Sequence, residues 1–183
     1  MTMSMFDKVI AAITPPETAQ QRADAHAKAR EAAEPGDWLS LVLDHHEEIG
    51  AAFAAVRAAC DSASRRVKLR QLGVVLTGHA QAEEAVLYPA LATHGEKTHA
   101  TAGYEEQSVT KVQMAILKDL DPMSQEFEDK LGHIEGAVLH HIYAEEHNWF
   151  IDLKQKAPAA DQAKLADRYT EEYGRYTGVE AMA

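Results

Sequence analysis

The feature of this sequence that most constrains its fold is a motif that occurs twice, a His followed four residues later by a Glu. One copy runs from His79 to Glu83 and the other from His141 to Glu145, and each continues to a bulky apolar residue and an aromatic one. Positions i and i+4 of an α-helix lie on one face, so each copy can direct an imidazole and a carboxylate at one point. A single copy would usually be a solvated surface pair, but two copies inside apolar-periodic segments indicate two helices that share a polar site.

Both motifs continue the apolar faces of their helices. The residues met by helical steps back from the two histidines are Leu76, Leu72 and Leu69 for His79, and Val138, Ile134, Leu131 and Phe127 for His141. Glu83 and Glu145 are therefore expected on core faces, where an unpaired carboxylate costs several kcal/mol or more. Such carboxylates are paired with histidines or bind a metal ion.

Two further apolar-periodic segments supply candidate partners for the motifs. His46 is followed by apolar residues at offsets of 3, 6, 7 and 10, and Glu106 has a similar, largely apolar set at the same offsets. We therefore predict that His46 and Glu106 point inward. His45 is an alternative to His46, either as a ligand or as a residue behind the ligand, and Glu105 or Gln107 is an alternative to Glu106.

The candidate metal ligands form a mixed set of imidazoles and carboxylates. They are His46, His79, Glu83, Glu106, His141 and Glu145. This mixture suits iron or manganese better than metals that prefer thiolates, although zinc remains an alternative. Inward Glu residues together with His–Glu pairs on facing helices are the way in which helix bundles hold two metal ions. Tyr88, Tyr104 and Tyr143 lie close enough in sequence to tune the site or to bind a metal, but tyrosines at such offsets are more often packing residues.

This pattern resembles the hemerythrin-like family, the HHE cation-binding domain, in which one His, a His-x-x-x-Glu, another His and a second His-x-x-x-Glu come from four successive helices. The resemblance covers roughly residues 38 to 155 and is strongest in LDHHEEI, HAQAEEAVLYP and HHIYAEEHNWF. It implies a non-haem pair of iron ions, bridged by oxide or hydroxide. The implied terminal ligands are His46, His79 and His141, and the implied bridging ligands are Glu83 and Glu145.

The sequence departs from the family on the third helix, where Glu106 stands in place of the His. An additional anionic ligand favours Fe(III) and lowers the reduction potential. Because an oxygen carrier needs a lasting diferrous state, this departure argues against simple oxygen carriage. The sequence predicts a di-iron protein that binds or senses oxygen, nitric oxide or iron. The alternatives are a di-iron enzyme that acts on peroxide or nitric oxide or repairs iron–sulfur clusters, and a bundle in which the metal is structural; the same ligands would serve each of them.

Helix-breaking residues divide the chain into three parts. The expected parts are an N-terminal helical extension (1–36), a metal-binding bundle (37–157) and a C-terminal helix and tail (158–183). Helices are expected at 4–13, 17–33, 38–59, 63–93, 99–119, 123–156 and 159–173. Short connections between the long helices favour an all-α, antiparallel up-down-up-down four-helix bundle, which brings the ligands to one level.

Charge and composition narrow the expected partners. The 183 residues carry a net charge of −11, which argues against nucleic acid and against anionic membrane surfaces. No segment is apolar enough to cross a membrane, and the first residues lack the pattern of a secretory signal. Cys60 is the single cysteine and cannot form an internal disulfide, so we expect a reducing, cytoplasmic environment. The expected partner is a small diatomic ligand or peroxide, and the sequence indicates no particular protein partner.

Overall fold

The computed structural model describes residues 16 to 178, and these residues form helices and connections with no strand among them. The helices are α2 (Ala19–Ala32), α3 (Trp38–Ala58), α4 (Ser62–Ala82), α5 (Tyr88–Thr93), α6 (Lys97–Asp119), α7 (Gln125–Ala144), α8 (Phe150–Lys156) and α9 (Ala159–Thr177). Two π-helical segments, η1 (Glu83–Leu87) and η2 (Glu145–Trp149), join α4 to α5 and α7 to α8. The all-helical prediction is confirmed. The helix expected at 4–13 lies outside the described residues.

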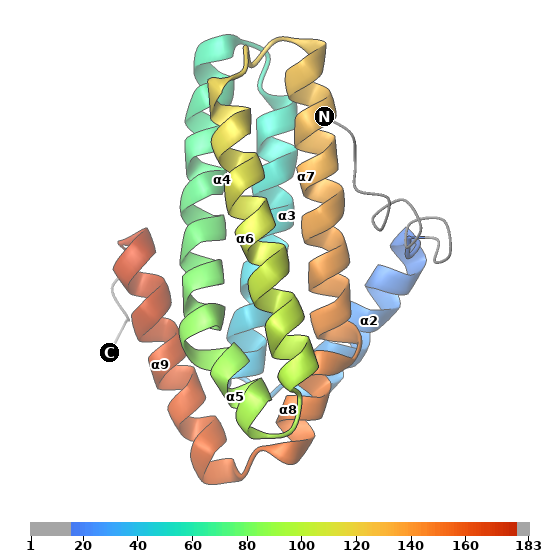
Figure 1. The fold of residues 1–183 in the computed structure, drawn as a ribbon, viewed down its shortest axis with the longest axis vertical. Coiled ribbons are helices and arrows are strands. Elements are labelled where there is room, and N and C mark those ends of the chain that lie inside the picture. The colour runs from blue at the N-terminus through green and yellow to red at the C-terminus, as the bar shows by residue number, and fades with distance from the viewer. Residues whose placement is uncertain (1–15, 179–183) are drawn as a thin grey trace.

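Four long helices, α3, α4, α6 and α7, lie side by side and form the body of the molecule (Figure 1). The helix α9 packs along α4 and α3, and α2 packs against α3 and η2. The strictly alternating up-down order of the four helices stays a prediction. No helix in the part of the chain that the structure describes combines the length and apolar character needed to span a membrane.

The long helices begin at side chains that cap their free backbone N–H groups. Asp37 accepts a hydrogen bond from the backbone N–H of Ser40 at 2.7 Å, just before α3 begins. Asp61 caps α4 in the same way, and Ser124 caps α7. An oxygen acceptor at this position satisfies one of the N–H groups that a helix leaves without an internal partner. The caps therefore fix where the three helices start.

The apolar core is split into two clusters by a polar layer. One cluster contains Leu43 and Phe150, and the other contains Ile49 and Phe53. His46 lies between Leu43 and Ile49 on α3, so the histidine interrupts the apolar face where the two clusters separate. The candidate site therefore lies inside the bundle, with apolar packing on both sides.

The inward face of α6 differs from the sequence-based expectation. Val109, Val112 and Ile116, whose offsets made them core candidates, are 58%, 59% and 38% exposed. The buried residues of this helix are Ala100, Gly103, Gln107, Met114 and Leu117. Much of the buried face consists of small and polar residues, so apolar periodicity pointed to the wrong side of α6.

Candidate metal centre

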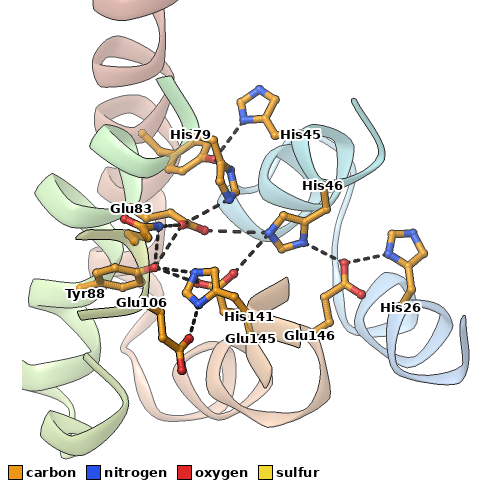
Figure 2. A network of polar contacts seen from close by, with 12 residues as sticks. His26, His45, His46, His79, Glu83, Tyr88, Glu106, His141, Glu145 and Glu146 are labelled. Atoms are coloured by element: carbon orange, nitrogen blue, oxygen red, sulfur yellow. Dashed lines mark hydrogen bonds and ion pairs between the residues drawn. The ribbon is translucent and has the colours of Figure 1, made fainter. Parts of the chain in front are cut away.

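Four buried side chains meet at the centre of the polar layer. They are His46 on α3, His79 on α4, Glu83 in η1 and Glu145 in η2, and each offers one ligand atom within 4.8 Å of the others (Figure 2). His46 Nε2, His79 Nε2, Glu83 Oε1 and Glu145 Oε2 have no hydrogen-bond partner among the described residues. Leaving buried polar atoms without a partner costs free energy, and a cation bound between them would satisfy all four. This group is able to bind a metal ion.

His141 and Tyr88 extend the cluster to one side. His141 Nε2 lies 3.2 Å from Glu145 Oε1 and 3.0 Å from the Tyr88 hydroxyl. The same hydroxyl lies 3.2 Å from Glu83 Oε2 and 3.1 Å from Glu145 Oε1. A second set of donor atoms, formed by His141 and the other oxygens of the two carboxylates, therefore converges around Tyr88.

Position 107, rather than position 106, faces the cluster from α6. Gln107 is buried, and its amide nitrogen donates to Glu83 Oε2 at 2.5 Å and to the Tyr88 hydroxyl at 2.7 Å. The side chain of Glu106 is 42% exposed, and its Oε2 lies 2.7 Å from His141 Nδ1, the nitrogen that faces away from the cluster. The expectation that Glu106 points into the site is thus corrected, because the buried face of α6 is rotated by one residue.

The Nδ1 atoms of His46 and His79, which face away from the cluster, contact residues that lie outside the four long helices. His46 Nδ1 lies 2.8 Å from Glu146 Oε1, which also contacts His26 Nδ1 on α2 at 2.9 Å (Figure 2). His79 Nδ1 lies 3.2 Å from the hydroxyl of Tyr169 on α9. A hydrogen bond at the outer nitrogen fixes the ring and leaves Nε2 directed at a ligand position. The added helices α2 and α9 therefore help to orient the site.

The remaining histidines do not join the central group. His45, the alternative to His46, contacts the Tyr169 hydroxyl at 2.9 Å and stacks on Tyr173 with ring centroids 3.6 Å apart. His140 contacts Glu17 near the surface, and His147 stacks on a neighbouring tyrosine. His45 therefore lies behind His79 and does not face the cluster.

These donors come from a segment that a known family covers. The hemerythrin HHE cation-binding domain matches residues 38–163, which is more than half of the chain. The chain belongs to the hemerythrin HHE family. The description of this family as a cation-binding domain agrees with the buried group of histidines and carboxylates, which is able to bind a metal ion.

A curated relative of this hemerythrin-like protein is the "DNA nickase" of Nostoc sp.. The two sequences are 27% identical over 124 residues, which cover 68% of this chain. This chain spans only 35% of the length of that relative. No solved structure matches the chain at a significant level.

Both ligand motifs of the hemerythrin-like domain end in a π-helical segment. The backbone N–H of Tyr88 donates to the carbonyl of Glu83, and that of Phe150 donates to the carbonyl of Glu145. Residues five apart lie about 140° apart around an α-helix, but a π-turn brings them onto the same face. The π-turn thus places Tyr88 directly beside Glu83, which the His-x-x-x-Glu spacing could not predict.

Tyr88 is the only one of the three candidate tyrosines that reaches the cluster. A Cβ atom at Gly103 would lie 2.6 Å from its ring, so a glycine on α6 is needed for the close approach. Tyr104 packs edge-on against Tyr88 and donates to the backbone carbonyl of Glu84 at 2.7 Å. Tyr143 stacks on a surface histidine and makes no contact with the cluster. The packing role expected for these tyrosines holds for Tyr104 and Tyr143.

Burial and neighbouring charges set the protonation of the cluster. Burial alone lowers the pKa of His46, but the adjacent carboxylates raise it to about 9. Burial and the charge of Glu145 raise the pKa of Glu83 well above its usual value. The pKa of His141 is also raised by carboxylates despite burial, whereas burial and the charge of His46 lower the pKa of His79. In the metal-free cluster, protons on His46, His141 and Glu83 therefore supply the positive charge that a bound cation would otherwise supply.

Proposed function

We propose that this protein is a non-haem di-iron protein that binds or senses a small ligand such as oxygen or nitric oxide. The observation that supports this proposal best is the group of four buried side chains, two histidines and two glutamates, each of which offers a ligand atom within 4.8 Å of the others. Each of the four also has a buried nitrogen or oxygen without a hydrogen-bond partner among the described residues. Mixed nitrogen and oxygen donors suit iron. Iron held there would supply one-electron chemistry and an open position for a small ligand.

The donors of the cluster fall into two sets, which supports two metal positions. The first set is His46, His79, Glu83 and Glu145, and the second is His141 with Glu83 Oε2 and Glu145 Oε1. Glu83 Oε2 also lies 3.2 Å from His79 Nε2, so this oxygen lies between the two sets. Because each carboxylate contributes an oxygen to both sets, the two glutamates are suited to bridge two ions. Tyr88 and Gln107 line the second position. This assignment keeps five of the six ligands predicted from the sequence and moves Glu106 to a supporting role.

The position of Gln107 changes the expected charge of the centre. A neutral amide faces the cluster where the sequence suggested a third carboxylate, so the group of inward residues carries one negative charge fewer. The centre therefore lacks the added anion that would favour Fe(III). A centre that can remain reduced long enough to bind oxygen reversibly is compatible with the donors present, which favours a binding or sensing role.

A second candidate, an enzyme that breaks down peroxide or reduces nitric oxide, is favoured by Tyr88. Burial and the charges of Glu145 and Glu83 raise the pKa of the Tyr88 hydroxyl well above its usual value, so the group keeps its proton. This hydroxyl lies 3.0 to 3.2 Å from donor atoms of the cluster. A protonated hydroxyl at this distance can donate a hydrogen bond to peroxide or nitric oxide bound at the centre.

We do not propose nucleic acid as a partner, although the Nostoc relative is a "DNA nickase". The shared region covers only 35% of that protein. A net charge of −11 disfavours the phosphate contacts that supply most non-specific affinity for nucleic acid.

The proposed cofactor can be tested on aerobically purified protein. We expect two iron ions per chain and near-ultraviolet absorption, and zinc or a single ion per chain would contradict the proposal. His79→Ala should remove the iron, whereas His133→Ala, an exposed histidine on α7, should retain it. Rapid mixing of the reduced protein with oxygen, nitric oxide or peroxide then separates the two candidates: a binding protein forms one lasting adduct per site, and an enzyme consumes many equivalents.

A further inference from the structure

A cavity of about 500 Å³ lies in the seam between α4 and α6, which are neighbours in Figure 1. Three residues of the candidate centre, His79, Gln107 and His141, line it, and Tyr176 of α9 lies at its edge. A water molecule has a share of roughly 30 Å³ in the liquid, and a diatomic ligand is of similar size. Cavities of roughly 300 to 1,000 Å³ are typical of sites for organic molecules. The cavity, which we call the seam from here on, is therefore far larger than a diatomic ligand needs.

The walls of the seam are apolar. Leu69, Leu76 and Met114 are among the lining residues, together with aliphatic residues of α7. The lining also contains Thr77 and Thr110, but their hydroxyls donate to backbone carbonyls of their own helices at 2.7 Å and 3.1 Å. These threonines have their hydroxyls satisfied within their helices. The seam thus suits an aliphatic chain better than a sugar or a nucleotide.

The charged groups of the seam are cationic. Arg70, Lys111 and Lys118 line the cavity, and none of the described lining residues is acidic. Lys111 is paired with Glu84 at 2.6 Å, whereas Arg70 and Lys118 make no ion pair with any residue between 16 and 178. This concentration of positive charge stands out in a chain with a net charge of −11. It complements an anionic group.

The two unpaired cations, Arg70 and Lys118, and the candidate centre lie at opposite ends of the seam. A contact of 3.4 Å between Arg66 Nη1 and the carbonyl of Lys118 brings the end of α6 beside the first turns of α4. At the other end, Gln107 contacts Glu83 of the cluster. The stretch of α4 from Leu69 to His79 is ten residues, or about 15 Å of helix. A molecule with an acid at one end and an aliphatic chain would therefore place its chain end near the cluster.

We propose that the seam binds a medium-chain aliphatic carboxylate, with the carboxylate beside Arg70 and Lys118 and the chain end toward His79 and His141. This ligand class adds a larger molecule to the proposed function. Only the claim that the chain end approaches a metal ion rests on that proposed function. Binding in the seam itself needs the apolar walls and the free cations and does not need the metal.

Filling the seam provides the first test, with decanoate as the probe and isothermal titration calorimetry as the measurement. A Cβ atom at Gly73, which lines the cavity, would have no atom within 4 Å, so the side chain of Gly73→Leu has room to enter the seam. We expect this variant to bind decanoate at least roughly tenfold more weakly, the effect of displacing two buried methylenes. Gly136→Leu, at an exposed position of α7 with equally open surroundings, should bind like the parent. Equal affinity for parent and Gly73→Leu would overturn the proposal.

Removing the cations provides the second test. The double variant Arg70→Gln/Lys118→Gln should bind decanoate roughly tenfold more weakly, because two partly screened ion pairs are lost. Its affinity for decanol, which has the same chain without the charge, should not change. The matched control Lys28→Gln/Lys97→Gln removes two exposed cations that do not line the cavity. An unchanged affinity for decanoate, or an equal loss for decanol, would overturn the assignment of the acid to Arg70 and Lys118.

The orientation of the ligand is tested in iron-loaded protein by ¹³C NMR of decanoate labelled at the methyl or at the carboxyl carbon. Paramagnetic broadening should be greater for the methyl carbon, and the opposite order would overturn the orientation. Protein that binds no iron would contradict the proposed function, but the two calorimetric tests would still decide whether the seam binds decanoate. The two failures are therefore distinguishable.

Discussion

The two copies of the His-x-x-x-Glu motif share their spacing, their burial and a π-turn after the Glu, yet they are supported differently. The outer nitrogen of His79 meets the neutral hydroxyl of Tyr169, whereas that of His141 meets the carboxylate of Glu106. The Glu residues that follow the motifs also differ. Glu84 pairs with Lys111 near the surface, but Glu146 is buried between two histidines.

A repeated ligand motif does not make the two sides of the centre equivalent. A carboxylate behind a histidine raises the basicity of the ring and fixes its tautomer, and a neutral hydroxyl does so less strongly. The pKa of His79 is lowered by burial and by the charge of His46, whereas carboxylates raise the pKa of both His46 and His141 despite burial. The centre is therefore more anionic around His46 and His141.

The largest loss of iron affinity is expected from Glu145→Gln, because Glu145 offers oxygens to both donor sets. We expect the affinity for iron to fall by more than roughly a hundredfold, the upper end of the loss when only a supporting residue is removed. Iron content after dialysis against a chelator measures the change. Glu126→Gln, on the exposed first turn of α7, the helix that leads into η2, should retain its iron. If both variants keep two ions, the ligand assignment is wrong.

The next largest effect is expected in the stability of the metal-free protein, which should depend on pH. The pKa of His46 is raised from 6.5 to about 9, so the proton on His46 stabilises the metal-free fold fully below pH 6.5, and this contribution is lost as the pH rises toward 9. The contribution is about 3 kcal/mol in order of magnitude. The raised pKa values of Glu83 and His141 act in the same direction. Metal-free protein should therefore unfold more easily at pH 9 than at pH 6.5.

Bound metal should reverse this trend, because ligands bind a metal only after they lose their protons. The difference in melting temperature between metal-loaded and metal-free protein should accordingly grow from pH 6.5 to 9. Thermal unfolding at both pH values, with and without iron, measures it. A difference that stays constant would show that protons and metal do not compete for this cluster.

The contrast between the residues that follow the two motifs is tested by Glu146→Gln and Glu84→Gln. Losing the carboxylate behind His46 should weaken iron binding roughly 10- to 100-fold, as is usual for residues that support metal ligands. Glu84→Gln removes only a surface pair with Lys111 and should change the affinity less than about twofold. The measurement is competition with a chelator of known affinity. Similar losses in both variants would mean that the two copies are supported alike.

Substitution on α6 tests which residue of this helix faces the centre. Gln107→His would place an imidazole against Glu83 and Tyr88, so we expect roughly tenfold tighter binding of the second ion, as for an added ligand that replaces a neutral amide. Glu106→His should add no ligand and should lose the contact with His141. Iron titrations that resolve the two ions distinguish the variants. A gain for Glu106→His would restore the original assignment.

The sequence predicted the members of the site that lie on strongly periodic helices. His46, His79 and His141 continue apolar faces, so burial followed from their spacing. The sequence favours Glu106 over Gln107, because Glu106 has apolar residues at helical offsets. The structure instead buries small and polar residues of α6 and exposes Val109, so Gln107 faces the site. Periodicity works only where apolar residues mark the buried face.

Three other members of the site could not be assigned from the sequence, for different reasons. Both motifs contain a pair of adjacent Glu residues, so nothing distinguished the buried Glu146 from the surface-paired Glu84. Tyr88 reaches the cluster through a π-turn, and its five-residue spacing from Glu83 would point elsewhere on a regular α-helix. Tyr169 comes from α9, and helix packing in three dimensions decides its contact with His79.

The smallest effect is expected from Tyr169→Phe, which removes the neutral support of His79 and leaves the aromatic ring in the apolar cluster. A neutral hydrogen bond contributes about 1 kcal/mol net, so iron affinity should fall roughly fivefold. Chelator competition measures this loss beside Glu146→Gln, which removes a charged partner and should cost more. If Tyr169→Phe weakened binding as much as Glu146→Gln, then the charge of the group behind each histidine would not matter, and hydrogen bonding alone would orient the ligands. If Tyr169→Phe had no effect, α9 would contribute packing to the site without positioning His79. A small but measurable loss is the result that the difference between the two motif copies requires.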